Sequence, residues 1–203
     1  ASCARSDACF AHSAHQRLRQ RIADVVGLPL ANVESGNFLR YRPGTSRYAP
    51  HHDMNARHSQ LQCGARVFSF LLYLTGELEK LEIACMLMQE RHAALDFPPD
   101  PETQAARPLM RDSDGSSDGG DTVFPEIRVS HGSADGGLAV SPVAGMVVWW
   151  ANAHPSHPLE TDPRVVHEAR APRRGEKVSA NFFVRAGDVQ AFFERGCLPG
   201  AWW

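Results

Sequence analysis

The stretch RVFSFLLYLT, residues 66–75, says most about the fold. Aromatic, leucine and β-branched side chains fill it, and no glycine or proline interrupts it, which is typical of a buried strand. Similar short segments occur at 37–42 (NFLRYR), 145–151 (GMVVWWA) and 178–185 (VSANFFVR), with glycine, proline and aspartate between them. These segments predict a mainly β protein with an antiparallel core.

One amphipathic helix is expected before this core. The apolar residues of segment 12–26 recur at helical spacing: Leu18, Ile22, Val25 and Val26. Gly27 and Pro29 then supply a stop. We expect the helix to pack against the sheet.

Residues 77–118 break the strand pattern. Their first half, GELEKLEIACMLMQERHAAL from residue 76 on, begins like a helix, and their second half is rich in proline, aspartate, serine and glycine. We interpret this segment as an insertion that ends in a loop. Long loops in compact domains are often functional, so a role in covering substrate stays open.

Length and charge limit the classes of protein. With 203 residues and 43% hydrophobic composition, a single domain over 1–203 is expected. A net charge of −2 gives no basic surplus for nucleic acid or anionic membrane. No apolar run approaches the roughly 20 residues that span a bilayer, so we expect no membrane contact by this chain itself. The chain begins with Ala1, and a leader upstream would be missing from it.

The five cysteines are scattered, odd in number and without a CxxC pair. This pattern argues against a zinc knuckle and against a fully paired disulfide framework. A bridge between Cys3 and Cys9 stays open.

The stretch YAPHHDMN, residues 48–55, holds the first candidate site residues. In an extended chain His51 and Asp53 project to one face, while His52 projects to the other. An imidazole and a carboxylate on one face are two of the three ligands of a 2-His-1-carboxylate iron site. By itself, a His-x-Asp pattern is a weak signal.

The candidate third ligand is His167. It lies in DPRVVHEARAPRRGEK, residues 162–177, after a turn signal and on a short β-branched run, with Lys177 ten residues downstream. A lone histidine in such a place is more often structural. The other histidines lie on the helix or in polar and proline-flanked stretches, where a solvated imidazole needs no explanation.

Taken together, the motifs resemble the catalytic domain of the prolyl 4-hydroxylases, which are Fe(II)- and 2-oxoglutarate-dependent dioxygenases. The resemblance is strongest to the small enzymes of plants and algae, and it runs from about His12 to Arg185. It rests on Tyr41, Gly44, Tyr48, Pro50, His51 and Asp53, on Arg66 leading into LLYLT, on GGDTVFP at 119–125, and on His167, Lys177 and Asn181.

The resemblance implies a double-stranded β-helix, a jelly-roll of eight core strands with N-terminal helices flanking one side. It implies Fe(II) held by His51, Asp53 and His167, with 2-oxoglutarate and O2 as cosubstrates and ascorbate to keep the iron reduced. The implied reaction hydroxylates proline at C4 in a proline-containing polypeptide and releases succinate and CO2. It also suggests the endoplasmic reticulum or secretory pathway as the compartment.

The resemblance assigns further roles. Lys177 would pair with the far carboxylate of 2-oxoglutarate, and Tyr41 and Thr122 would complete the hydrogen bonds that a buried ion pair needs. The alternative for Lys177 is a solvated lysine at a strand start. For Thr122 it is an ordinary β-former.

Substrate contacts implied by the family are Tyr48, Arg66, Asn181 and Phe183. Tyr48 would face a proline ring and Arg66 a peptide carbonyl, although a core tyrosine and a surface arginine are the simple alternatives. The chain departs from the plant-like pattern in three ways. It has one extra residue between Tyr41 and His51, Phe183 where tryptophan is usual, and the insertion beside the site, so peptide specificity does not carry over.

Two alternatives stay open. The same oxygenase chemistry could act on another side chain, a free amino acid or a small metabolite. A jelly-roll binding module without activity would share the architecture, because a fold does not determine function. A cupin-like metal enzyme would share it too, but cupins typically draw more histidines from the first strand, and His52 would be available only if that strand bulged, so we set this reading aside.

Overall fold

A computed structural model describes residues 8–55, 61, 63–74, 119–128 and 137–189 of the chain. The insertion predicted at 77–118 and Cys3 of the possible Cys3–Cys9 bridge lie outside these residues. In the described part, no helix has the length and apolar character needed to cross a membrane.

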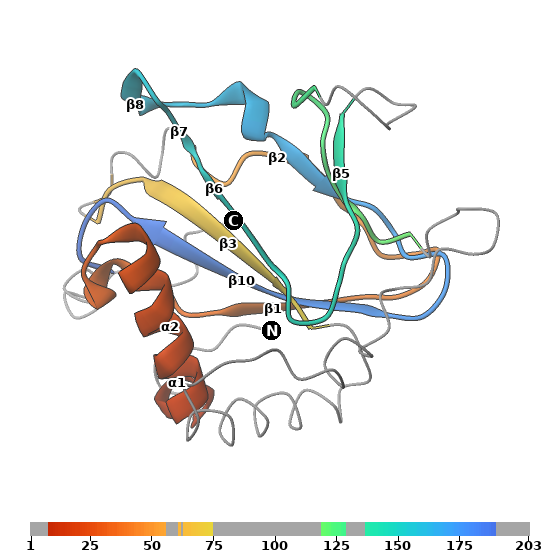
Figure 1. Cartoon of the computed structure of the whole chain (residues 1–203), viewed down its shortest axis with the longest axis horizontal. Coiled ribbons are helices and arrows are strands. Elements are labelled where there is room, and N and C mark those ends of the chain that lie inside the picture. The colour runs from red at the N-terminus through yellow and green to blue at the C-terminus, as the bar shows by residue number, and fades with distance from the viewer. Residues whose placement is uncertain (1–7, 56–60, 62, 75–118, 129–136, 190–203) are drawn as a thin grey trace, which may run out of the picture.

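Eight strands form two four-stranded antiparallel sheets (Figure 1). The first sheet has the order β1, β10, β3, β6, with the bounds Asn37–Tyr41, Lys177–Arg185, Arg66–Tyr73 and Val147–Ala151. The second sheet has the order β2, β9, β4, β5, with the bounds Tyr48–His51, His167–Ala169, Thr122–Phe124 and Leu138–Val140. The predicted mainly β, jelly-roll architecture is confirmed.

The remaining elements are short. A two-stranded hairpin of β7 (Ala153–His154) and β8 (His157–Thr161) connects β6 to the second sheet, and single 3-10 turns lie at Leu30–Asn32 and Pro163–Val165.

Helices α1 (Ala8–Ala11) and α2 (Ser13–Val26) lie together on one side of the first sheet (Figure 1). The predicted helix is present, but His12 stands just before it, and its ring accepts a hydrogen bond from the Ala14 amide as a cap. Gly27, at φ 67°, ends the helix in the left-handed conformation that glycine adopts readily. Val25, in the last turn, is 59% exposed rather than packed.

The central strand β10 is buried on both faces. Its even-numbered residues Ala180, Phe182 and Val184 join one apolar cluster with Ile22 and Ala23 of α2. Because side chains alternate along a strand, the odd-numbered residues point the other way, into the space between the two sheets. Strand β10 therefore carries the helix-facing core on one side and the polar residues Lys177, Ser179 and Asn181 on the other.

Candidate metal centre

Two neighbouring strands of the second sheet bring the predicted ligands together. His51 on β2 and His167 on β9 are direct partners in the antiparallel register. Asp53 lies two residues past the end of β2, rather than on the strand as the extended-chain prediction had it. The His51 Nε2 atom is 3.5 Å from Asp53 Oδ1, and the His167 Nε2 atom is 3.7 Å from Asp53 Oδ2.

Both imidazoles are oriented by their own backbone. His51 Nδ1 lies 2.8 Å from the Ala49 carbonyl oxygen, and His167 Nδ1 lies 3.0 Å from that of Val165. A carbonyl oxygen only accepts, so each Nδ1 carries the proton and donates it. The Nε2 lone pairs are therefore left to face Asp53, which is the arrangement that holds histidine ligands at metal sites.

The carboxylate is held by a relay of buried polar groups. Ser69 on β3 donates to Asp53 Oδ2 at 2.6 Å, and Asn152 Nδ2 donates to Ser69 Oγ at 2.8 Å. All three side chains are buried. The relay connects the first sheet to the end of β2 and fixes the direction in which the carboxylate points.

Electrostatics favour a charged carboxylate beside a neutral imidazole. Burial alone would raise the pKa of Asp53, but the two neighbouring imidazoles of His51 and His167 and the hydrogen bond from the Ser69 hydroxyl bring it below the usual value. Burial lowers the pKa of His167, against the opposing charge of Asp53. Near neutral pH these are the protonation states that a divalent cation requires of its ligands.

The donor set fits ferrous iron. In the described residues, His51, Asp53 and His167 form one group whose ligand atoms all lie within 4.8 Å of one another. Two imidazole nitrogens and one carboxylate leave coordination positions for other ligands, as in non-haem iron oxygenases. His52 faces away, since its Nε2 lies 2.9 Å from the Asp162 carbonyl oxygen and its Nδ1 accepts from the Met54 amide.

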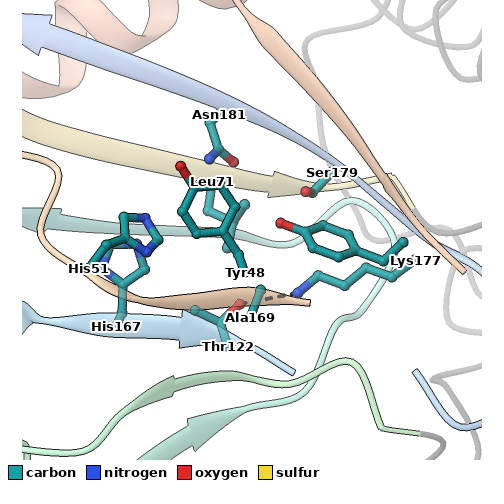
Figure 2. A pocket seen from close by; sticks show the side chains of 10 residues that line it. Tyr48, His51, Leu71, Thr122, His167, Ala169, Lys177, Ser179 and Asn181 are labelled. Carbon is teal, nitrogen blue, oxygen red and sulfur yellow. Dashed lines mark hydrogen bonds between the residues drawn. The ribbon is translucent and has the colours of Figure 1, made fainter. Parts of the chain in front are cut away.

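A pocket extends from this centre between the two sheets (Figure 2). Its lining comprises Tyr41, Tyr48, His51, Leu71, Thr122, His167, Ala169, Lys177, Ser179 and Asn181. Figure 2 shows the two histidines at one end and the Lys177 side chain at the other.

Lys177 is buried, with 1% of its surface exposed. Its Nζ atom donates to the Gly120 carbonyl oxygen at 2.7 Å and lies 3.4 Å from Thr122 Oγ1. The ammonium also lies 5.0 Å from the centre of the Tyr41 ring. Burial lowers its pKa to about 8, against the charge of Asp121. The structure thus brings Lys177, Thr122 and Tyr41 together, and the solvated lysine considered above does not occur.

Tyr73 at the end of β3 completes this group and was not predicted. Its hydroxyl donates to Thr122 Oγ1 at 2.8 Å. Burial raises the pKa of Tyr73 and of Tyr41 to about 12 each, so both phenols keep their protons near neutral pH. No local pattern singles out Tyr73, because it sits inside an apolar strand.

The predicted substrate contacts divide into two pairs. Tyr48 is 41% exposed, its ring lies 4.1 Å from that of His51, and it lines the pocket together with Asn181. Arg66 and Phe183 do not line this pocket. They contact each other instead, with the Arg66 guanidinium 3.8 Å from the centre of the Phe183 ring.

Arg66 is held by an acidic residue that sequence reasoning missed. Its Nε and Nη2 atoms donate to the Glu34 carboxylate at 2.9 and 2.8 Å, and Arg185 Nε donates to the same carboxylate. Burial would raise the pKa of Glu34, but the two guanidinium groups hold it below the usual value. The predicted contacts of Arg66 and Phe183 with a peptide stay predictions.

Known proteins are similar to this chain in fold. No family model matches the sequence, and neither does any curated protein. The viral collagen prolyl hydroxylase of Paramecium bursaria Chlorella virus-1, solved as its 2OG complex, superposes with a TM-score of 0.55 at 16% identity, covering 92% of this chain and 78% of that one. A truncated form of that protein gives a TM-score of 0.54 at 15% identity, covering 92% and 74%. The chain therefore has a prolyl hydroxylase-like fold, as predicted.

Proposed function

We propose that the protein is an Fe(II)- and 2-oxoglutarate-dependent dioxygenase. The observation that carries the proposal is the pocket itself: two imidazoles and a carboxylate meet at one end, and a buried ammonium lies at the other. A dicarboxylate of suitable length joins such ends, with its keto acid toward the metal and its far carboxylate toward Lys177. The viral hydroxylase with the similar fold was solved as a complex with 2OG.

Different residues of the chain would bind the metal and orient the cosubstrate. His51, Asp53 and His167 would hold Fe(II), and the Ser69–Asn152 relay fixes the carboxylate that completes the set. Lys177, with Thr122 and Tyr41, would orient the cosubstrate. Bound iron would couple the oxidative decarboxylation of 2-oxoglutarate by O2 to substrate hydroxylation, so that one oxygen atom ends in succinate and the other in the product.

For the substrate we propose a peptidyl proline, hydroxylated at C4. The exposed Tyr48 ring stands beside His51 at the metal end of the pocket, where an aromatic face suits packing against a pyrrolidine ring. The neighbours in fold are named as prolyl hydroxylases. Other side chains, free amino acids and metabolites are the alternative outcomes of the test.

The first experiment measures succinate formed from 2-oxoglutarate with Fe(II), O2 and ascorbate. We expect succinate release from the wild-type protein. His51→Ala, Asp53→Ala and His167→Ala should each lose Fe(II) binding and turnover and keep their circular dichroism spectrum, because apolar burial holds the barrel together. His157→Ala, which removes an exposed imidazole outside the pocket, is the matched control and should behave as wild type.

The second experiment identifies the substrate class. Proline-containing peptides are incubated under the same conditions, and mass spectrometry locates any added oxygen. One oxygen on proline supports the prolyl assignment. Succinate release with every peptide unmodified would refute that assignment, and no Fe(II)-dependent succinate with any substrate would refute the oxygenase.

A further inference from the structure

Two neighbouring loops of the barrel carry an excess of arginines. The loop 42–47 joins β1 to β2, and the loop 170–176 joins β9 to β10. The two loops lie side by side (Figure 1), and the Gly44 amide of the first donates to the Pro172 carbonyl oxygen of the second at 2.9 Å. We call these two segments the basic loops, because their charged residues are Arg42, Arg47, Arg170, Arg173 and Arg174 against Glu176 alone. The whole chain, by contrast, has a net charge of −2.

Three of these arginines are exposed and form no ion pair in the described part of the chain: Arg42, Arg47 and Arg173. The carboxylate of the basic loops does not serve them, because Glu176 already pairs with Arg40 of β1 at 2.6 Å. Cations that are held close together without counter-charges create a positive local potential. This surface therefore favours an anionic partner.

The first basic loop leads directly to the metal centre. Arg47 is followed by β2, whose exposed Tyr48 lines the pocket and whose last residue is His51. Among the described strands β2 is an edge of its sheet, so one of its long sides has no strand beside it. At about 3.3 Å per residue, the strand separates Arg47 from His51 by roughly 13 Å. A polypeptide with its proline at the metal therefore reaches this loop about four residues away, since an extended or polyproline chain rises about 3 Å per residue.

We propose that the basic loops bind acidic side chains of the peptide substrate, about four residues from the proline that is hydroxylated. This inference rests on the proposed function and narrows its substrate class to acidic proline-containing polypeptides. The carboxylates of such a peptide supply the counter-charges that Arg42, Arg47 and Arg173 lack. Arginine suits this task, because its guanidinium donates two parallel hydrogen bonds to one carboxylate. A neutral or basic peptide would not make these contacts.

The test compares three peptides that differ only in charge. Each contains one proline, with glutamate, glutamine or lysine about three to five residues away on both sides. Fluorescence anisotropy measures their binding to protein that is loaded with 2-oxoglutarate and with Zn²⁺ in place of iron, which prevents turnover. We expect the glutamate peptide to bind about 3- to 10-fold more tightly than the glutamine peptide, since each exposed ion pair contributes little. The difference should largely disappear near 1 M NaCl, where the Debye length falls to about 3 Å.

Charge variants locate the preference on the protein. A triple variant with Arg42→Gln, Arg47→Gln and Arg173→Gln should bind the glutamate peptide no more tightly than the glutamine peptide. Arg47→Glu should shift the preference toward the lysine peptide, because it replaces an attractive charge with a repulsive one. Arg21→Gln removes an exposed arginine of α2, outside the basic loops, and should leave all three affinities at the wild-type value. All these positions are exposed, so we expect every variant to fold.

Two results overturn the inference. Equal affinities of the wild-type protein for the glutamate and glutamine peptides mean that the basic loops do not recognise acidic residues. A preference for glutamate that survives in the triple variant places the recognition elsewhere on the protein. The proposed function is tested separately, by succinate formed from 2-oxoglutarate with Fe(II). Succinate release together with equal peptide affinities removes the acidic preference and leaves the oxygenase standing, whereas no succinate with any peptide refutes the oxygenase.

Discussion

The buried ammonium of Lys177 provides the sharpest prediction. Its pKa lies at about 8, against 10.5 for an ordinary lysine, because burial disfavours the charged form. At about 1.4 kcal/mol per pKa unit, holding this charge in the ligand-free protein costs about 3 kcal/mol. A bound dicarboxylate supplies the missing counter-charge, so ligand binding should raise the pKa.

The sign of the stability effect follows from this shift. Below about pH 8 the lysine is protonated in both folded and unfolded chains, and the full cost is present. Between about pH 8 and 10.5 the unfolded chain binds more protons than the folded one, so stability rises with pH. Lys177→Met should lack this rise. From about pH 8 to about pH 10.5, the free energy of urea unfolding of the wild type should therefore increase by about 3 kcal/mol more than that of Lys177→Met.

The sequence makes the titration direct, because Lys80 and Lys177 are its only lysines. Protein labelled with carbon-13 lysine gives two side-chain signals by NMR, and Lys177→Arg assigns them. We expect the Lys177 signal to titrate near pH 8 in the ligand-free protein. The second sample is saturated with 2-oxoglutarate and loaded with a diamagnetic cation such as Zn²⁺ in place of Mn²⁺, and there we expect the signal to titrate above pH 10. A ligand-free pKa at the ordinary lysine value would refute the reasoning.

Three other substitutions test the site and its support. Ser69→Ala removes the donor to Asp53 and should weaken Mn²⁺ binding about 10- to 100-fold; calorimetry that finds an unchanged affinity would contradict the positioning role. Glu34→Gln leaves two buried guanidinium groups without their counter-charge and should lower the free energy of urea unfolding by about 3–5 kcal/mol. An unchanged free energy of unfolding would contradict the buried ion-pair role of Glu34. The wild type should itself lose this stability as the pH falls below 4.5, the ordinary value, toward the lowered pKa of Glu34. Phe182→Ala should cost about 3–5 kcal/mol but spare Mn²⁺ affinity, since Phe182 faces α2; a parallel loss of both would contradict the separation of the two faces.

The long strands were predictable and the short ones were not. Segments 66–75 and 178–185 match β3 and β10, because both are long and rich in the aromatic and β-branched residues that strands favour. Strands β4, β5 and β9 have three residues each, too few to show a period of two. Strand β2 contains Pro50, which a sheet tolerates at an edge, and β2 is an edge strand.

Some residues of the candidate site were likewise predictable from the sequence, and others were not. His51 and Asp53 share a local pattern, but His167 emerged from family resemblance because register, not sequence distance, makes it the partner of His51. Ser69 and Tyr73 lie within the apolar strand β3, where no local sequence pattern marks their hydroxyl groups as part of a site. Glu34 precedes β1 and finds its two arginines only when β3 and β10 lie side by side.

The pairing of β2 with β9 has a mechanical consequence. Strand β2 sits at an edge and is joined to the sheet through two register pairs, with an irregularity between Tyr48 and His51. A cation held by His51 and His167 would connect β2 to β9 at this short pairing. Without the ion, we expect the edge strand β2 to separate from β9 more often and to become accessible to proteases, while the rest of the barrel stays folded, so that the proposed metal ligands would also stabilise the edge of the sheet.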